Sequence, residues 1–259
     1  MKKELIHFIR WELVDDSDVE NLLAQLPDWG VENIVAHPKW FRNPKENYIA
    51  KISKLLEKYN LRSTACHALW GGGNDCINLD VNEQKKMIEN QSRFLKELQM
   101  LNVKTFTMHL GYLDEISLEE NFSILSKTID ELLVVCEETN ITIALENSQE
   151  PIPVIKKMEE LVTRYNHPNL GTCFDSGHAN CYGNGVANLL NIMKNNIVTC
   201  HLHDNYGLKD DHNPPNEGNI NWDELDTLLD SLPRLKHAET ESGIYDKTAW
   251  KKFCEVLGK

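Results

Sequence analysis

Six histidine and carboxylate residues follow short apolar, β-branched segments of this chain, and they are the side chains most suited to chemistry. Successive members are separated by 42, 37, 29, 26 and 38 residues, the length of one strand-plus-helix unit each time. Imidazole and carboxylate groups are the ligands that divalent metal ions use in proteins. If each segment is a parallel strand, the six side chains meet at one end of the sheet, because parallel strands share their carboxyl ends there. The six residues are His67, His109, Glu146, Asp175, His201 and Glu239.

The segments that must position these side chains alternate regularly along the chain. Strands are expected at 5–10, 33–37, 62–67, 103–110, 141–147, 170–175, 197–204 and 234–241. Helices are expected at 17–29, 44–60, 80–101, 117–139, 153–166, 185–195, 222–231 and 246–257. Eight strands in strict alternation with eight helices predict a single α/β domain over residues 1–259, a (β/α)8 TIM barrel. A dinucleotide-binding fold is disfavoured, since the glycine run 71–73 follows a strand with the wrong spacing.

Local signals support several helix starts. Ser117 and Glu120 have the spacing of a capping box. Asp80 is suited to cap the helix that follows it, and Pro44 is suited to a first helical turn.

Composition and charge exclude several classes of protein. No apolar stretch approaches the roughly 20 residues that span a membrane, and the first residues lack the apolar core of a signal peptide. Net charge is −13, whereas a nucleic-acid binder usually carries a basic excess. The seven cysteines include no CxxC pair, which indicates reduced, buried thiols. We therefore expect a cytoplasmic protein with no membrane or nucleic-acid partner.

The last four of the six residues, Glu146, Asp175, His201 and Glu239, would follow strands five to eight and form a metal-binding quartet. Such a set suits Mn²⁺, Mg²⁺, Co²⁺ or Zn²⁺ and leaves positions open for substrate or water. The sequence leaves open whether other residues bind further metal ions or contact the substrate. The residues concerned are His67 and His109, which could share Glu146, and His178, Asp210 and His212, which could surround a third ion.

Other residues of the loops after the strands are candidates for substrate binding. Trp70 and Tyr112 could form an apolar wall against a sugar ring. His203 shares a strand face with His201 and could contact the substrate or support a ligand, while Asp204 is suited to orient a ligand. The loop near 203–219 is long enough to be a lid or to carry ligands.

Seven segments, spread over about two-thirds of the chain, resemble the xylose isomerase-like TIM-barrel superfamily, which contains sugar and sugar-phosphate isomerases and epimerases together with endonuclease IV. They are TACHALW, FTMHLG, IALENS, GTCFDSGHAN, VTCHLHDN, DDHNPPNEGNINW and HAETE. The resemblance implies a metal-dependent isomerase or epimerase acting on a sugar, a sugar phosphate or a polyol-derived carbonyl compound. It is compatible with a homodimer or a homotetramer.

By the same resemblance, Glu146 and Glu239 would be the acid/base pair that moves a proton through an enediolate, and His178 would contact a substrate oxygen. Two departures disfavour a free-ketose 3-epimerase. Gly207 stands where those enzymes have an arginine, and Ile152 stands where they have a second glutamate.

Endonuclease IV offers an alternative, a multi-zinc phosphodiester hydrolase. Its nine zinc ligands correspond to His67, His109, Glu146, Asp175, His178, His201, Asp210, His212 and Glu239. The charge of −13 and the segment IALENSQEP do not suit DNA binding. A ligand-binding barrel that has lost activity is a third class, against which the intact carboxylates argue.

Overall fold

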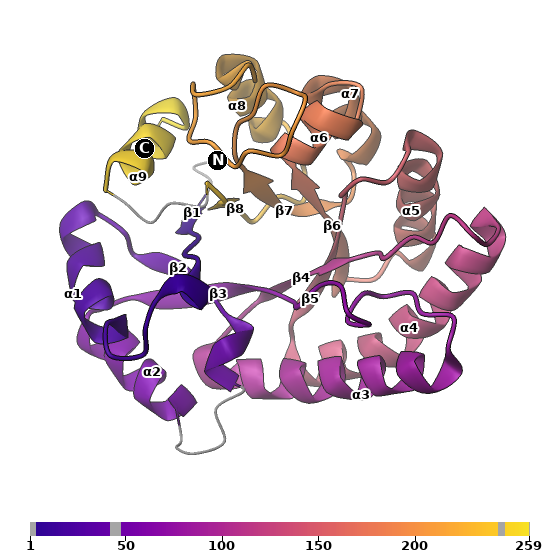
Figure 1. Cartoon of the computed structure of the whole chain (residues 1–259), viewed down its shortest axis with the longest axis horizontal. Coiled ribbons are helices and arrows are strands. Elements are labelled where there is room, and N and C mark those ends of the chain that lie inside the picture. The colour runs from indigo at the N-terminus through magenta and orange to yellow at the C-terminus, as the bar shows by residue number, and fades with distance from the viewer. Residues whose placement is uncertain (1–3, 42–47, 243–246, 259) are drawn as a thin grey trace.

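The computed structural model describes residues 4–41, 48–242 and 247–258, which form a closed barrel of parallel strands surrounded by helices (Figure 1). The strands pair in the order of the chain, from β1 round to β8 and back to β1. They are β1 (Glu4–His7), β2 (Asn33–Ala36), β3 (Arg62–His67), β4 (Thr105–His109), β5 (Thr142–Glu146), β6 (Leu170–Asp175), β7 (Ile197–Leu202) and β8 (His237–Thr240). The predicted (β/α)8 barrel is confirmed.

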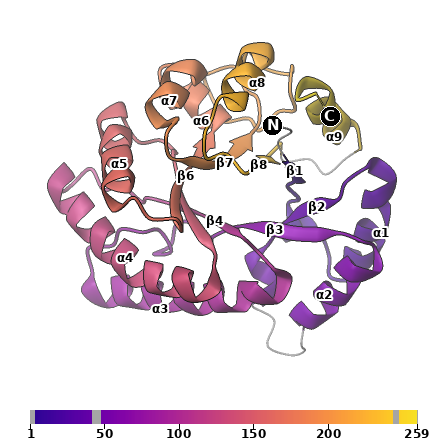
Figure 2. The same ribbon diagram turned by 180° about the vertical axis from the view of Figure 1, so that it is seen from behind.

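The helices lie on the outside of the barrel, as the view from behind also shows (Figure 2). They are α1 (Val19–Trp29), α2 (Tyr48–Lys58), α3 (Val81–Leu98), α4 (Leu118–Thr139), α5 (Ile152–Tyr165), α6 (Ser176–Tyr182), α7 (Val186–Met193), α8 (Trp222–Asp230) and α9 (Lys247–Val256). The short helix α6 was predicted as loop, and that prediction was wrong. Its seven residues are too few to show an apolar period, and it begins directly at Asp175, whose side chain accepts a hydrogen bond from the His178 amide.

Two helix starts follow the predicted capping chemistry. The Asp80 carboxylate accepts hydrogen bonds from the amides of Asn82 and Glu83 at the start of α3. Ser117 and Glu120 form a reciprocal capping box at the start of α4. Both arrangements satisfy amides that have no partner within the helix. The prediction for Pro44 lies outside the described residues.

Most of the core lies between the strands and the helices, where it includes Trp11, Trp40 and Phe106. Inside the barrel two smaller apolar clusters lie apart. One consists of Ile6, Val35 and Ala65 with the half-buried Phe8 packed against it, and the other of Ala144, Cys173 and Val198. At the carboxyl ends of the strands, the buried side chains include the candidate residues His67, Glu146 and His201.

The described cysteines are all free thiols, in agreement with the sequence. Within the same described ranges, the helices are too short or too polar to cross a bilayer.

Candidate metal centre at the mouth of the barrel

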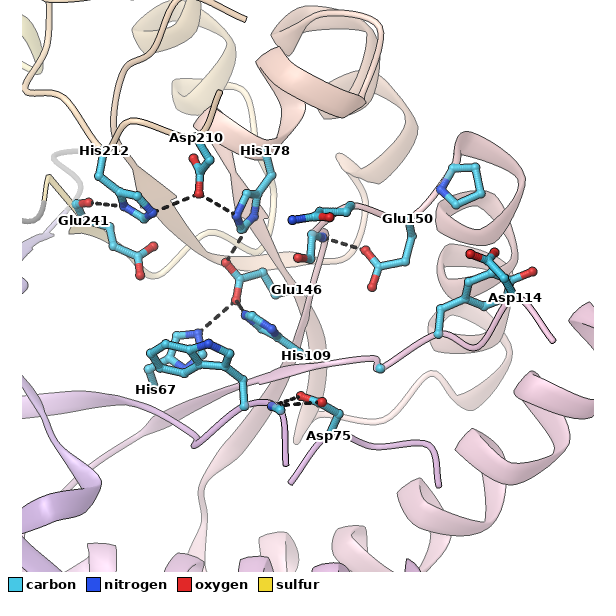
Figure 3. A pocket seen from close by; sticks show the side chains of 17 residues that line it. His67, Asp75, His109, Asp114, Glu146, Glu150, His178, Asp210, His212 and Glu241 are labelled. Atoms are coloured by element: carbon cyan, nitrogen blue, oxygen red, sulfur yellow. Dashed lines mark hydrogen bonds and ion pairs between the residues drawn. The ribbon is translucent and has the colours of Figure 1, made fainter. Parts of the chain in front are cut away.

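A cavity of about 590 Å³ opens at the carboxyl ends of the strands. Its walls come from the loops that follow β3 to β7 and from the end of β8, so residues far apart in the sequence face one space (Figure 3). The candidate residues that line it are His67, Trp70, His109, Tyr112, Glu146, His178, Asp210 and His212. The structure therefore brings most of the predicted site residues to one cavity.

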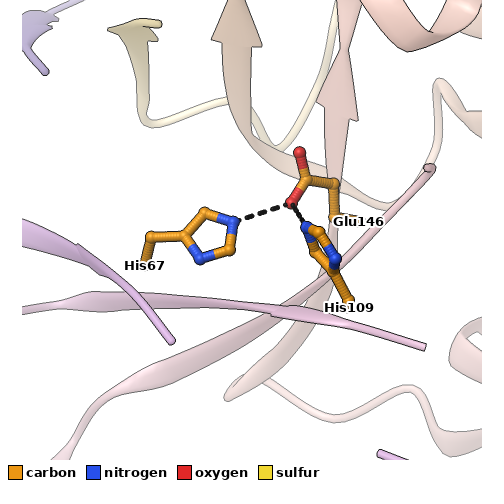
Figure 4. Close-up of side chains that lie close together, drawn as sticks. All are labelled: His67, His109 and Glu146. Carbon is orange, nitrogen blue, oxygen red and sulfur yellow. Dashed lines mark hydrogen bonds and ion pairs between the residues drawn. The ribbon is translucent and has the colours of Figure 1, made fainter. Parts of the chain in front are cut away.

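Glu146 lies at the centre of this group, at the end of β5 (Figure 4). Its Oε2 atom is 3.1 Å from His67 Nε2 and 3.2 Å from His109 Nε2. Its Oε1 atom is 2.8 Å from His201 Nδ1. Burial by itself would raise the pKa of this carboxyl, but His201, His109 and His67 outweigh it and hold the pKa well below its usual range. A charged carboxylate is therefore kept inside the protein by three imidazoles.

Three further potential ligands, from the ends of other strands, converge on Glu146. One potential ligand atom from each of Glu146, Asp175, His201 and Glu241 lies within 4.8 Å of the others. The Glu241 Oε2 atom is buried and has no hydrogen-bond partner among the described residues, although His201 Nδ1 lies 3.0 Å away as an ion pair. Three carboxylates and one imidazole are a donor set that divalent cations accept, and an unsatisfied buried oxygen is suited to one. These residues fit a divalent metal ion.

The sequence assigned Glu239 to this quartet, and that assignment stays a prediction, because Glu241, two residues further on, is the carboxylate whose oxygen lies within 4.8 Å of the other three ligand atoms. Glu239 is fully buried one layer deeper, where its Oε1 atom accepts a hydrogen bond of 2.8 Å from the Thr199 hydroxyl. Its Oε2 atom lies 3.4 Å from His201 Nε2, on the side of the ring away from Glu146. It does not line the cavity at the mouth of the barrel. A carboxylate in this place orients the His201 ring, as carboxylates behind metal-binding histidines commonly do.

A second set of candidates is held together by Asp210 in the long loop between β7 and α8. Its Oδ2 atom lies 3.3 Å from His178 Nε2 and 2.9 Å from His212 Nε2. Burial would lower the pKa of both imidazoles, but nearby carboxylates raise the pKa of His178 to about 11 and that of His212 to about 9. His212 adopts a left-handed backbone conformation with φ of 52°, which is uncommon for a non-glycine residue. The loop thus carries both groups to the mouth at some conformational cost.

His203 does not line this cavity, although it was a candidate for substrate binding. It is fully buried, and its Nε2 atom is 3.1 Å from Asp175 Oδ2. Its ring is stacked on that of His212, with centroids 4.1 Å apart and planes at 12°. Ring nitrogens bind metals in the plane of the ring, so two stacked rings cannot both direct a lone pair to one ion. We therefore assign His203 to the support of Asp175.

The glycine of the Asp-Ser-Gly-His segment has a steric role at this point. A Cβ atom on Gly177 would lie 1.9 Å from Cε1 of His203. The segment therefore needs glycine for His203 to reach Asp175.

The sequence did not single out several acidic residues that line the cavity. Glu241 shares the inward face of Glu239 by strand alternation, which is the signal that could have identified it. Asp75, Asp114 and Glu150 also line the cavity but lie in loops, where no period places them. Burial raises the pKa of Glu150, whose Oε2 atom accepts a hydrogen bond from the Ser148 amide.

Asp204 fixes the long loop in place, whereas the sequence had suggested that it orients a metal-binding residue. Its carboxylate accepts hydrogen bonds from the Trp222 indole at 2.9 Å and from the Ile220 amide at 3.1 Å. The close approach of Gly218, whose added Cβ would lie 2.2 Å from Asp204 Oδ1, completes this anchor. The loop is therefore fixed at both ends, with Asp210 and His212 between them.

Comparison with known proteins gives one family. The profile of a family described as xylose isomerase-like TIM barrels matches residues 23–255. An uncharacterized protein of Methanocaldococcus jannaschii is 30% identical over 178 residues, which are 61% of this chain and 59% of that protein. An uncharacterized protein of Sinorhizobium fredii is 32% identical over 106 residues, 40% of this chain and 34% of that protein. The chain thus matches less than two thirds of the length of either relative.

Solved structures share the fold over nearly the whole chain. A D-tagatose 3-epimerase-like protein is 21% identical with a TM-score of 0.77, and the match covers 99% of this chain and 97% of that one. An IolI protein with a bound zinc atom is 18% identical with a TM-score of 0.79, and the match covers 98% of each chain. A Thermus thermophilus protein soaked with zinc chloride is 18% identical with a TM-score of 0.72, over 99% of this chain and 98% of that one.

Proposed function

The chain belongs to the family of xylose isomerase-like TIM barrels, and from that membership we propose that it is a metal-dependent sugar isomerase or epimerase. The substrate is a carbohydrate or a polyol-derived compound with a carbonyl group, and a proton is moved on and off the carbon beside that carbonyl. The structural likeness to a D-tagatose 3-epimerase-like protein supports the fold of such an enzyme. The charged, buried Glu146 in contact with three imidazoles carries the proposal for the site.

Glu146, Asp175, His201 and Glu241 would hold the metal ion. When bound, a divalent ion polarises a carbonyl group and stabilises negative charge on its oxygen. Glu239 and His203 would keep His201 and Asp175 in position, through the contacts of 3.4 Å and 3.1 Å that they make with them.

Two members of this quartet, Glu146 and Glu241, also line the cavity. They come from β5 and from the end of β8, which are separated by two strands of the barrel. One of these two carboxylates would remove a proton from the carbon beside the carbonyl, and the carboxylic acid formed in that step would return the proton to the substrate. This assignment replaces Glu239 by Glu241 in the acid/base pair. His178, whose raised pKa keeps its ring protonated, would donate a hydrogen bond to a substrate oxygen.

A hydrolase of the endonuclease IV type is the second candidate, and one observation favours it. Asp210 brings His178 and His212 together beside the group formed by His67, His109 and Glu146. These residues would hold two further ions. The acidic net charge of −13 opposes a DNA substrate.

Proton transfer and metal content together test the proposal. We expect the purified protein with Mn²⁺, Mg²⁺, Co²⁺ or Zn²⁺ to exchange a carbon-bound proton of at least one ketose, aldose or inosose for solvent deuterium, as measured by NMR. Removal of the metal with a chelator should stop the exchange. Three zinc ions per chain together with cleavage of a phosphodiester, and no exchange on any of these compounds, would establish the hydrolase instead.

A further inference from the structure

A smaller cavity of about 170 Å³ adjoins the metal centre on the side of β1 and β2. The two cavities share part of their lining, so they lie next to each other. The shared residues are His67, Trp70, His212 and Glu241. We call the smaller cavity the side compartment. Nothing in the proposed proton transfer uses it.

The walls of the side compartment differ from those of the metal centre. They include the apolar side chains or backbone of Phe8, Ile9, Val35, Ala36, Pro38 and Leu69. Phe8 is held in place because its amide donates a 3.2 Å hydrogen bond to the Thr240 hydroxyl of β8, and it packs on the interior cluster around Val35. Trp70, which is 58% exposed, packs edge-on against His67 with ring centroids 5.1 Å apart. The boundary between the compartments is thus aromatic.

The charged residues of the side compartment that lie away from the metal centre form ion pairs with one another. Glu12 Oε1 lies 2.7 Å from Arg10 Nε, and Glu12 Oε2 lies 3.5 Å from His37 Nε2. A carboxylate already in contact with Arg10 would repel a second anion. The compartment is therefore suited to an apolar group rather than to a phosphate or carboxylate.

We propose that the side compartment binds a phenyl-sized apolar substituent of the substrate, so that the substrate is an aryl-substituted sugar that also carries a carbonyl group, with its polar ring at the metal centre. The inference rests on the proposed function for the polar part and on the side compartment for the aryl part. An apolar protein cavity of about 150 Å³ accommodates benzene, and this compartment is slightly larger, at about 170 Å³. Phe8 and Trp70 would provide aromatic contacts to the ring.

Fluorobenzene tests the compartment without any sugar chemistry. We expect ¹⁹F NMR to show binding to the full chain with a Kd of about 1 mM. Phe8→Ala, which removes a wall, and Leu69→Trp, which fills the space, should each weaken binding at least tenfold. Leu228→Ala truncates a half-buried apolar side chain in the separate cavity between α7 and α8, and it should leave binding unchanged.

Thermal unfolding of each variant shows whether it folds. Because Leu69→Trp adds bulk to a half-exposed residue, it remains informative if Phe8→Ala does not fold. No fluorobenzene binding, or equal binding by wild type and the folded variants, would overturn the proposal.

A pair of glycosides tests the connection between the compartments. Phenyl β-D-glucoside should bind the metal-loaded protein at least tenfold more tightly than methyl β-D-glucoside, and Phe8→Ala should remove most of that difference while leaving methyl glucoside binding unchanged. Equal affinity for both glucosides would refute the aryl substrate. If fluorobenzene binds but no sugar exchanges deuterium, the proposed isomerase function fails and the side compartment stands.

Discussion

Two buried glutamates at opposite ends of the barrel have opposite charge behaviour. Glu146, at the mouth, is 1% exposed, and Glu159 of α5, at the base beside the start of β7, is 7% exposed. Burial raises the pKa of Glu159 to about 7, and the side-chain Nδ2 of Asn196 donates a hydrogen bond of 2.7 Å to its Oε2 atom. Burial also opposes charge on Glu146, yet imidazoles lower the pKa of that carboxyl. The partners, and not the residue type or its burial, decide which end of the barrel carries a charge.

The difference matters for function because a charge in the interior is costly unless it has a partner. At the base, an amide partner lets the carboxyl take up a proton near neutral pH. At the mouth, Glu146 stays ionised among three histidines. Of these two glutamates, only Glu146 is therefore held ionised beside a cavity where a cation or a carbon acid could bind.

Exchanging each glutamate for glutamine should produce the largest contrast. Glu146→Gln removes the charge that three imidazoles surround, and we expect the rate of deuterium exchange into substrate to fall by a factor of about 10³. Glu159→Gln lies at the other end of the barrel and should keep the wild-type rate. Circular dichroism of both variants checks the fold. A Glu146→Gln enzyme with near-normal exchange would contradict the assignment of the mouth as the reaction site.

A metal titration should distinguish the roles of Glu239 and Glu241. We expect a smaller effect here than for the exchange of Glu146. At a free metal concentration of about 100 times Kd, binding should add about 2.7 kcal/mol to the stability of the wild type. Glu241→Gln removes a proposed ligand and should abolish most of the metal-induced rise in Tm. Glu239→Gln removes only a carboxylate behind His201 and should keep part of that rise. The reverse order, seen by calorimetry, would return Glu239 to the quartet.

The sequence predicts the barrel well because its signals are local and repeated. Alternating apolar segments, the Asp80 cap and the Ser117 capping box all depend on residues a few positions apart. Helix α6 was missed because one side chain, that of Asp175, starts it just where β6 ends. Such a start depends on the position of a single carboxylate and not on a pattern.

The site could be predicted in part. The strand ends placed Glu146, Asp175 and His201 together, since parallel strands bring them to one edge. Alternation alone could not choose between Glu239 and Glu241, because both face inward and only the depth of the strand in the barrel separates them. Alternation also could not predict that the buried carboxylate at the mouth is charged and the one at the base is not. The imidazoles that keep Glu146 charged come from three other strands.

The pH dependence of stability is the smallest of the expected effects. It tests the comparison of the two glutamates at the base of the barrel, where Glu159 lies. The pKa of Glu159 is about 7 in the folded protein against an ordinary value of 4.5, so the folded state binds more protons between these values. Stability should therefore fall as pH rises from about 4.5 to 7, by roughly 3 kcal/mol at about 1.4 kcal/mol per unit of pKa. Glu159→Gln should remove this component, so that the variant exceeds the wild type in stability at pH 8 and nearly matches it at pH 4.5. Urea unfolding at the two pH values measures the difference, and the exposed neighbour Glu160→Gln is the matched control. A wild-type protein that loses no more stability than Glu159→Gln over this range would show that the base, like the mouth, keeps its carboxylate charged.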